Sequence, residues 1–215
     1  MLANFVSSVD GRASFQGRSG ELGDDGDLAV FRALRREVDA VLIGTSTART
    51  ERYGRLIKDP RARERRRERG LAAEPLACML TRGGDVPFEI PLFAEPEARV
   101  IVFSGADVDP GHPAAEVELV RLAPDQLSFA NALSHLRTRH GVRALLCEGG
   151  PSVLSALVRE RVLDELFLTV VPKLTGGGDG PGLTQGPELP APAEMALAGL
   201  LERAGSLFLR YRLEN

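Results

Sequence analysis

The sequence contains no tryptophan, and aromatic residues make up only 5% of it. Proteins that bind single-stranded nucleic acid stack the bases on aromatic side chains, so this scarcity disfavours such a function. The formal net charge of −3 also disfavours a general nucleic-acid or membrane-surface binder. We therefore expect a small-molecule substrate, with neither nucleic acid nor a membrane as a partner.

Cysteine and long apolar runs are equally scarce. The two cysteines, Cys78 and Cys147, both stand in apolar, strand-like runs. Reduced core thiols are therefore expected, not a disulfide or a metal-binding pair. No apolar run approaches the roughly 20 residues that a membrane-spanning helix needs, and the N-terminus lacks the pattern of a signal peptide. These absences indicate a cytoplasmic protein.

Several catalytic signatures are also missing. The sequence has no P-loop, no Ser-His-Asp order and no His-x-Glu followed by Pro-Cys-x-x-Cys, the signature of zinc deaminases. The three histidines, His112, His135 and His140, stand in predicted loops or on a predicted helix surface, where a non-catalytic role is expected. Hydride transfer remains compatible with such a chain, because there the cofactor carries the difficult chemistry.

The residues that are present predict an α/β fold. A chain of 215 residues with 43% hydrophobic content can form a sizeable core, and we expect one domain over 1–215. Short apolar runs alternate with segments of helical periodicity, which predicts a mostly parallel sheet. Strands are expected at 2–8, 40–43, 75–81, 99–104, 117–122, 144–147, 165–171 and 206–213. Helices are expected at about 24–38, 129–140 and 152–162, whereas 195–201 fits a strand and a short helix equally well.

The strongest charge run is RARERRRER at 61–69. Two glutamates interrupt it and can pair with arginines one helical turn away. A solvated surface helix or a mobile insertion is therefore expected, in preference to a nucleic-acid site.

The most distinctive stretch begins where the apolar run 144–147 stops at Glu148, followed by Gly149, Gly150 and Pro151. Glycines permit a sharp turn and close approach of the backbone to a ligand, and proline suits the first turn of a helix. The amides of that turn, at Ser152 and Val153, would favour a pyrophosphate. A plain strand-to-helix turn without a ligand is the alternative.

Polar residues follow other predicted strands as well. Asp10 precedes Gly11 at the end of the first strand, which is also the usual composition of a simple turn. The 44–47 segment, Gly-Thr-Ser-Thr, provides either a backbone-rich ligand turn or an ordinary helix cap. Arg82 comes after a strand end, where a guanidinium could select NADPH over NADH through the 2′-phosphate or could simply lie on the surface.

Four motifs together carry a resemblance to a known family. They are Ser8-Val-Asp-Gly11, Glu148-Gly-Gly-Pro151, Val162-Leu-Asp-Glu-Leu166, and Val171-Pro-Lys-Leu174 with the glycines at 176–178. The chain resembles the C-terminal reductase domain of the riboflavin-biosynthesis deaminase/reductase, in a stand-alone form. This resemblance implies a dihydrofolate-reductase-like fold: a mostly parallel central sheet flanked by helices, with an antiparallel C-terminal hairpin.

The resemblance also implies an activity and a set of residues. The expected reaction is NADPH-dependent reduction of a ribosylamino-pyrimidinedione 5′-phosphate to its ribitylamino product. Asp10 and Glu148 are expected to be catalytic. The expected substrate-binding residues are Asn4, Ser19, Arg35, Glu51 and Lys58. The expected cofactor-binding residues are Gly44, Thr45, Ser46, Thr47, Thr81, Arg82, Ser104, Gly149, Gly150, Pro151, Ser152 and Val153.

Two other functions remain open from the sequence. One is a dihydrofolate or pterin reductase, which would not need Arg35 and Lys58 for a substrate phosphate. The other is a nucleotide-binding module without turnover. A homodimer is expected, both from the habit of the family and because the apolar strands 167–171 and 207–213 would make exposed edges that favour pairing.

Overall fold

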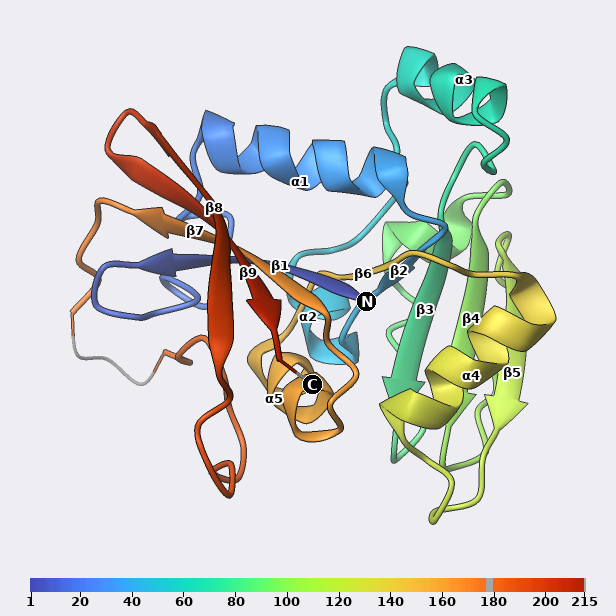
Figure 1. Ribbon diagram of the computed structural model, residues 1–215. Helices are drawn as coiled ribbons and strands as arrows, with labels where there is room; N and C mark the ends of the chain where they lie inside the picture. The colour runs from blue at the N-terminus through green and yellow to red at the C-terminus, as the bar shows by residue number, and fades with distance from the viewer. Residues whose placement is uncertain (177–179, 215) are drawn as a thin grey trace. The chain divides into compact units, whose positions relative to one another are not determined.

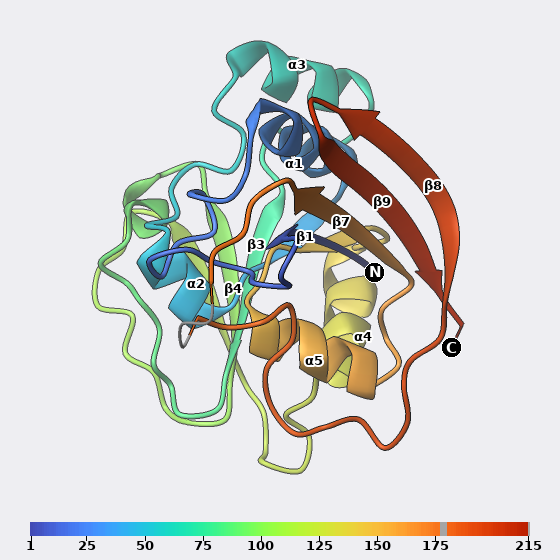
Figure 2. The same cartoon turned by 90° about the vertical axis from the view of Figure 1, so that its left-hand side faces the viewer.

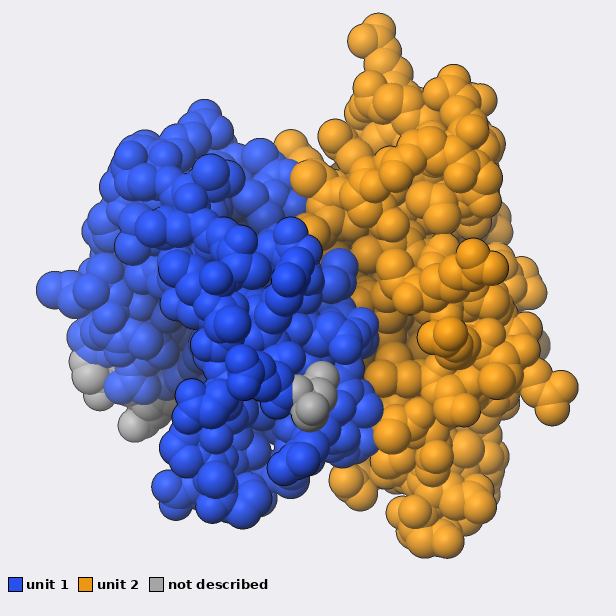
Figure 3. Space-filling view, viewed as in Figure 1, with its two compact units in different colours: residues 1–31, 147–215 blue, residues 32–146 orange. Residues whose placement is uncertain are grey.

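The computed structural model describes residues 1–176 and 180–214. Gly177 and Gly178 of the predicted motif therefore lie outside the described residues. Contacts divide the chain into two compact units, coloured separately in Figure 3. Unit 1 comprises residues 1–31 and 147–215, and unit 2 comprises residues 32–146. The expected single domain over 1–215 stays a prediction.

Unit 1 contains a parallel strand pair extended by an antiparallel hairpin (Figures 1 and 2). Its elements are β1 (Leu2–Ser8), α5 (Pro151–Arg159), β7 (Glu165–Val171), β8 (Met195–Arg203) and β9 (Ser206–Leu213). β1 pairs in parallel with β7, and β9 pairs antiparallel with both β7 and β8. Residues 195–203 thus form a strand and not a helix, and both Ala204 and Gly205 have positive φ in the hairpin turn.

The strand pairing of the C-terminal hairpin shows that the prediction of the edge strands is wrong. Both segments expected at an edge, 167–171 and 207–213, are paired on two sides, because β7 lies between β1 and β9 and β9 lies between β7 and β8. β8 is the edge strand, and Figure 2 draws it as the outermost strand of the hairpin. Its nine residues are almost all exposed.

Unit 2 is built on four parallel strands in the order β5-β4-β3-β2. Its elements are β2 (Ala40–Leu42), α2 (Thr45–Thr50), α3 (Pro60–Glu68), β3 (Leu76–Thr81), a 3-10 helix η1 (Pro91–Ala94), β4 (Arg99–Ser104), β5 (Glu116–Arg121) and α4 (Phe129–His140). β3 and β4 are buried along almost their whole length, as expected for inner parallel strands. Cys78 is buried here, and Cys147, the first residue of the second segment of unit 1, is also buried; both are free thiols.

Two elements run across the boundary between the units. They are α1 (Asp25–Glu37) and β6 (Leu145–Cys147). The predicted α/β class, with mostly parallel strands and a C-terminal antiparallel hairpin, is confirmed. Among the described helices, none is long and apolar enough to cross a membrane.

Local capping explains where the helices begin and end. Asp24, the predicted cap of α1, accepts a hydrogen bond from the Asp27 amide at 2.8 Å. Ser128 caps α4 in the same way by accepting from the Asn131 amide at 3.1 Å. Gly141 ends α4 in a left-handed conformation with φ of 65°, as the glycine at that position predicted.

The arginine run is a helix, as expected, but one of its members is not solvated. Arg66 of α3 is only 1% exposed. Its guanidinium donates hydrogen bonds of 2.9 Å to the carbonyl oxygens of Arg35, Arg36 and Val38 and to that of Ala72. The prediction of a fully solvated arginine helix is therefore wrong at this residue, because its side chain binds the carbonyls at the end of α1.

Candidate functional site

The predicted residues fall on both units, and each unit holds its own group. In unit 1, Asn4 lies on β1 with only 8% of its surface exposed. Its Oδ1 atom has no hydrogen-bond partner among the described residues. Leaving a buried polar atom without a hydrogen-bond partner costs about 1–3 kcal/mol, so most such atoms have a protein, water or ligand partner. Asn4 therefore offers an acceptor that a bound polar molecule could satisfy.

Asp10 lies directly after β1, and its carboxylate is held from two directions. The Ser8 hydroxyl donates to Oδ1, and the Gly176 amide donates to Oδ2 at 3.0 Å. The Thr175 amide donates to the same carboxylate at 3.2 Å. These bonds, the one from Ser8 first, lower the pKa of Asp10 to about 2. The side chain is thus an anion at neutral pH, suited to electrostatic stabilisation and not to donating a proton.

The glycine turn at 148–151 leads into α5 as predicted. Glu148 is only 7% exposed. Gly149 has φ of 116°, which a residue with a side chain rarely adopts, and the Gly149–Gly150 peptide bond is cis. Pro151 occupies the first position of α5, and no side chain caps Gly150.

One amide in the first turn of α5 already has a hydrogen-bond partner in the backbone of that turn. The amide of Val153 donates to the Gly150 carbonyl at 2.9 Å. Ser152, by contrast, is exposed at the helix start. Of these two predicted cofactor-binding residues, Ser152 is therefore better placed to offer an amide.

Ser19 is half-buried in the loop between β1 and α1. Its carbonyl accepts from the Leu22 amide at 3.0 Å. The same loop is joined to the segment after residue 179, because Arg12 bridges Gly182 and donates to the Gly180 carbonyl at 2.6 Å. Residues 12–24 are thus fixed by contacts and do not form an isolated loop.

In unit 2, the predicted cofactor residues meet at the carboxyl ends of adjacent parallel strands. Gly44 to Thr47 follow β2 and begin α2, with Gly44 as the cap. Thr81 ends β3 and lies opposite Ser104 at the end of β4. Open parallel sheets bind ligands at this edge. The register therefore brings three of the predicted segments to one edge of the unit 2 strands.

These strand-end residues differ in how much of their side chains is exposed to solvent. Arg82 is exposed, whereas Thr81 and Ser104 are 7% and 3% exposed. The Ser104 hydroxyl donates to the Ala106 carbonyl at 2.6 Å and accepts from the Ala106 amide at 3.1 Å. Ser104 thus shapes the turn after β4, whereas the side chains of Arg82 and Ser46 reach solvent.

The residues predicted to bind the substrate phosphate also lie in unit 2. Arg35 is 9% exposed, donates to the Leu56 carbonyl at 2.9 Å and places its guanidinium carbon 5.4 Å from the centre of the Tyr53 ring. Glu51 ends α2, and Lys58 is exposed just after Leu56. Arg35 is therefore anchored next to the segment that carries Lys58.

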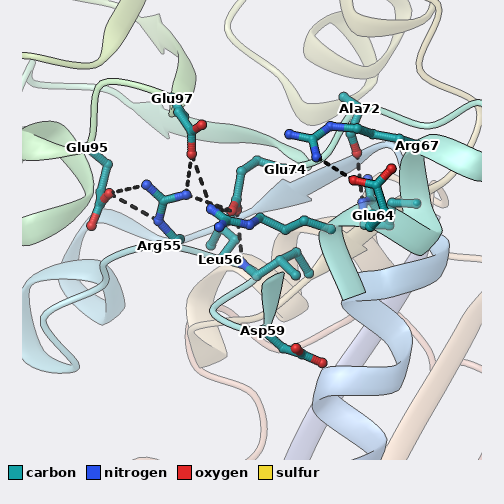
Figure 4. Close-up of polar contacts among 12 residues, drawn as sticks. Arg55, Leu56, Asp59, Glu64, Arg67, Ala72, Glu74, Glu95 and Glu97 are labelled. Atoms are coloured by element: carbon teal, nitrogen blue, oxygen red, sulfur yellow. Dashed lines mark hydrogen bonds and ion pairs between the residues drawn. The ribbon is translucent and has the colours of Figure 1, made fainter. Parts of the chain in front are cut away.

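A charged network, which the sequence did not reveal, fixes that segment (Figure 4). Arg55 binds Glu95 at 2.7 Å and also pairs with Glu97. Glu74 accepts from the Ile57 amide at 2.9 Å, and burial raises the pKa of its carboxyl group. The network thereby positions residues 55–57, including the Leu56 carbonyl that holds Arg35. Its partners are 17 to 42 residues apart, so no local pattern could identify it.

Thr175 and Gly176 also contact Asp10; Gly176 belongs to a motif that the sequence marked, whereas Thr175 was not singled out. They bind Asp10 across 165 and 166 residues of sequence. For Thr175, the position between Leu174 and Gly176 of that motif was the available signal.

The strand order and the C-terminal antiparallel hairpin define an α/β protein with a dihydrofolate-reductase-like fold. Dihydrofolate reductase from Enterococcus faecalis, solved in complex with NADP(H), has this fold, with a TM-score of 0.52 and 14% identity over 100% of this chain and 96% of that one. The chain belongs to the family described as the RibD C-terminal domain, which matches residues 1–207.

One related sequence and one solved structure that are similar to this chain carry names of pyrimidine reductases. A protein of Archaeoglobus fulgidus named 2,5-diamino-6-ribosylamino-4(3H)-pyrimidinone 5′-phosphate reductase is 27% identical over 191 residues, which is 86% of each chain. The structure of a pyrimidine reductase-like protein from Corynebacterium diphtheriae has a TM-score of 0.83 and 24% identity, covering 100% of this chain and 91% of that one. The resemblance to the riboflavin-pathway reductases is therefore confirmed.

Proposed function

We propose that the protein is an NADPH-dependent reductase that converts a ribosylamino-pyrimidine 5′-phosphate to the ribitylamino product by hydride transfer. The observation that carries this proposal is the family match over residues 1–207, which includes every predicted site residue. The relatives named as pyrimidinone 5′-phosphate reductases support the substrate class.

The residues support the reaction in distinct ways. The unpaired Oδ1 of Asn4 offers a hydrogen-bond acceptor to the substrate. Asp10 supplies a fixed negative charge, since its pKa is lowered to about 2 by Ser8 and by the 175–176 amides. Such a charge would stabilise a positively charged iminium form of the opened sugar, and NADPH would supply the hydride. Arg35 and Lys58 are the proposed ligands of the 5′-phosphate.

Glu148 is proposed to act on the substrate and not on the cofactor. A carboxylate followed at once by two glycines at a helix start would repel cofactor phosphates, so its position requires another explanation. Hydrogen bonding to the substrate, strengthened as positive charge develops, provides one.

The variant Glu148→Gln tests this role, because it keeps the shape and removes the charge. We expect kcat/KM to fall by about 10- to 1000-fold, or about 1.4–4 kcal/mol, while NADPH affinity is retained. Glu188→Gln, at an exposed glutamate of the same unit, serves as the control. Near wild-type turnover by Glu148→Gln, or loss of NADPH binding by a folded variant, would show that the assigned role is wrong.

A dihydrofolate or pterin reductase is the second candidate function, favoured by the dihydrofolate-reductase-like fold. The two candidates differ in the substrate phosphate. NADPH oxidation should therefore be measured with the pyrimidine 5′-phosphate and with dihydrofolate, in wild type and in Lys58→Ala. Turnover of dihydrofolate alone, unchanged in Lys58→Ala, would reject the proposed substrate class.

We also propose that the protein forms a homodimer through β8. Leu197, Leu200 and Leu201 on this edge strand are 55%, 55% and 71% exposed. An apolar edge strand with unpaired backbone groups favours pairing with another chain. The resemblance to the family likewise implies a homodimer, without specifying its interface.

A further inference from the structure

Two of the three histidines converge on one glutamate in unit 2, and none of these three residues is among the predicted site residues. Glu118 lies on β5, and His135 and His140 lie on the last turns of α4. The Nε2 atoms of His135 and His140 are 3.6 Å and 3.5 Å from the two oxygens of the Glu118 carboxylate. One ligand atom from each residue lies within 4.8 Å of the other two.

Hydrogen bonds do not account for this arrangement. Both Nε2 atoms are buried, and neither has a hydrogen-bond partner among the described residues. Their separations from the carboxylate exceed the usual 2.7–3.2 Å of an N–H···O bond by several tenths of an ångström. If the Nε2 atoms carry no proton, three lone-pair donors face one another, and a cation between them removes that repulsion.

The same separations suit a metal centre. In a tetrahedral zinc site with bonds of about 2.0–2.2 Å, the ligand atoms are about 3.3–3.6 Å apart. The observed 3.5 Å and 3.6 Å fall in this range but run to the two different oxygens of the carboxylate; with one oxygen as the ligand, the three ligand atoms all lie within 4.8 Å of one another. His140 is also the last residue of α4, where the negative end of the helix dipole favours a cation.

We propose that Glu118, His135 and His140 form a zinc-binding site that joins β5 to the C-terminal end of α4. Two imidazoles and one carboxylate suit zinc, and the fourth position is open to water. The side chains of Glu118 and His140 are 48% and 14% exposed, so the ion can enter from the Glu118 side. This site is separate from the proposed reductase function and does not rest on it.

The position of β5 gives the metal a structural role. β5 is the outer strand of the unit 2 set, pairs only with β4 among the described strands, and is mostly exposed. On the helix side, His135 packs edge-on against Phe103 of β4, with ring centres 5.4 Å apart. Zinc bound to the folded state would therefore tie a weakly buried strand to a helix that already packs on its neighbour, and would raise stability by mass action.

The test uses the full chain without an affinity tag, treated with a chelator and titrated with zinc chloride in a calorimeter. We expect about one equivalent to bind, and the thermal unfolding midpoint to rise with zinc concentration. Cobalt(II) in place of zinc should give the absorption spectrum of a four-coordinate ion. The buried Cys78 and Cys147 do not compete, because burial raises the pKa of both thiols, that of Cys147 to about 12.

Variants at two of the three positions decide whether this cluster is the site. Glu118→Gln and His140→Gln should each weaken zinc binding by at least about 100-fold, beyond the about 10- to 100-fold cost of losing an outer-shell partner. His112→Gln removes the one other histidine and should leave binding unchanged. Circular dichroism of the metal-free variants confirms folding. Absence of zinc binding in the wild type, or equal loss in His112→Gln, would overturn the proposal.

Discussion

The buried guanidinium of Arg66 provides the sharpest prediction about stability. The perturbation is Arg66→Met, which keeps much of the side-chain length and removes every donor. The four carbonyl oxygens that Arg66 now binds at 2.9 Å would lose their partner, and three of them belong to residues 35, 36 and 38 at the end of α1. The last carbonyls of a helix need such partners, since no amide of the helix reaches them.

The size of the expected stability loss follows from the carbonyl oxygens that are left without a hydrogen-bond donor. A buried acceptor without a partner costs about 1–3 kcal/mol, but neighbouring contributions do not add in full, and methionine recovers some apolar contact. Burial lowers the pKa of Arg66, yet an arginine stays protonated in proteins, so the native state contains a buried charge bound only to carbonyls. We expect the free energy of unfolding to fall by about 2–4 kcal/mol, because several buried carbonyls lose their donor while removal of the buried charge offsets part of that cost.

The assay is urea unfolding followed by far-UV circular dichroism, with Arg67→Met as the matched control. Arg67 is the next residue of the same helix, 54% exposed and paired with Glu64 at 3.0 Å (Figure 4). That variant should lose less than about 0.5 kcal/mol, as is typical of exposed pairs. If the two variants differ by less than about 1 kcal/mol, the reasoning about the end of α1 is refuted.

The remaining predictions concern the cofactor, the dimer, Asp10 and one turn. Arg82→Ala should shrink the preference for NADPH over NADH in cofactor titrations, and equal wild-type affinities would reject the role of Arg82. Leu201→Lys should turn a dimer into a monomer in light scattering, and a monomeric wild type would reject the dimer. Because the pKa of Asp10 is depressed, its stabilising effect is present above pH about 3.8 and is lost as the pH falls toward about 2. The stability difference between wild type and Asp10→Asn should therefore be constant from pH about 7 to about 5 and shrink below about 3.8, and a difference that grows on acidification would contradict this. Gly105→Ala should cost about 1–3 kcal/mol in urea unfolding, because its Cβ would lie 2.9 Å from the Arg82 carbonyl oxygen, whereas Gly83→Ala meets nothing within 4 Å and should cost little.

Elements defined by their own residues could be predicted closely. β1, β4, β7, β9 and α4 have the bounds that the sequence indicated, because hydrophobic periodicity and capping residues are local signals. Contacts between distant segments could not be predicted. Nothing next to Arg66 distinguishes it from Arg65 or Arg67, since the carbonyls that it binds belong mainly to residues 28 to 31 positions earlier.

In the candidate site, too, local features could be predicted from the sequence and contacts between distant residues could not. Its glycine turn and strand-end polar residues were visible as patterns, whereas the groups that hold them were not. The local pattern of Asp10 fits a simple turn and only the resemblance predicted a catalytic role, whereas its lowered pKa depends partly on amides 165 and 166 residues away. His135 and His140 looked like surface residues, because their common partner Glu118 lies on a strand that precedes the helix.

Arg35 of α1 and Arg66 of α3 are joined by a hydrogen bond, and they show how contacts between distant segments bear on the proposed function. Arg35, the proposed phosphate ligand, accepts a hydrogen bond from Arg66 at its main-chain carbonyl and donates one from its own guanidinium to the Leu56 carbonyl. The segment that carries Leu56 is fixed in turn by Arg55 and Glu74. A guanidinium held in this way loses little conformational entropy when an anion arrives, whereas an exposed lysine such as Lys58 must be ordered at that moment. The structure thus separates the two proposed phosphate ligands into one that is already in place and one that has to be recruited, and the cost of losing Arg35 should accordingly appear in stability as well as in substrate affinity.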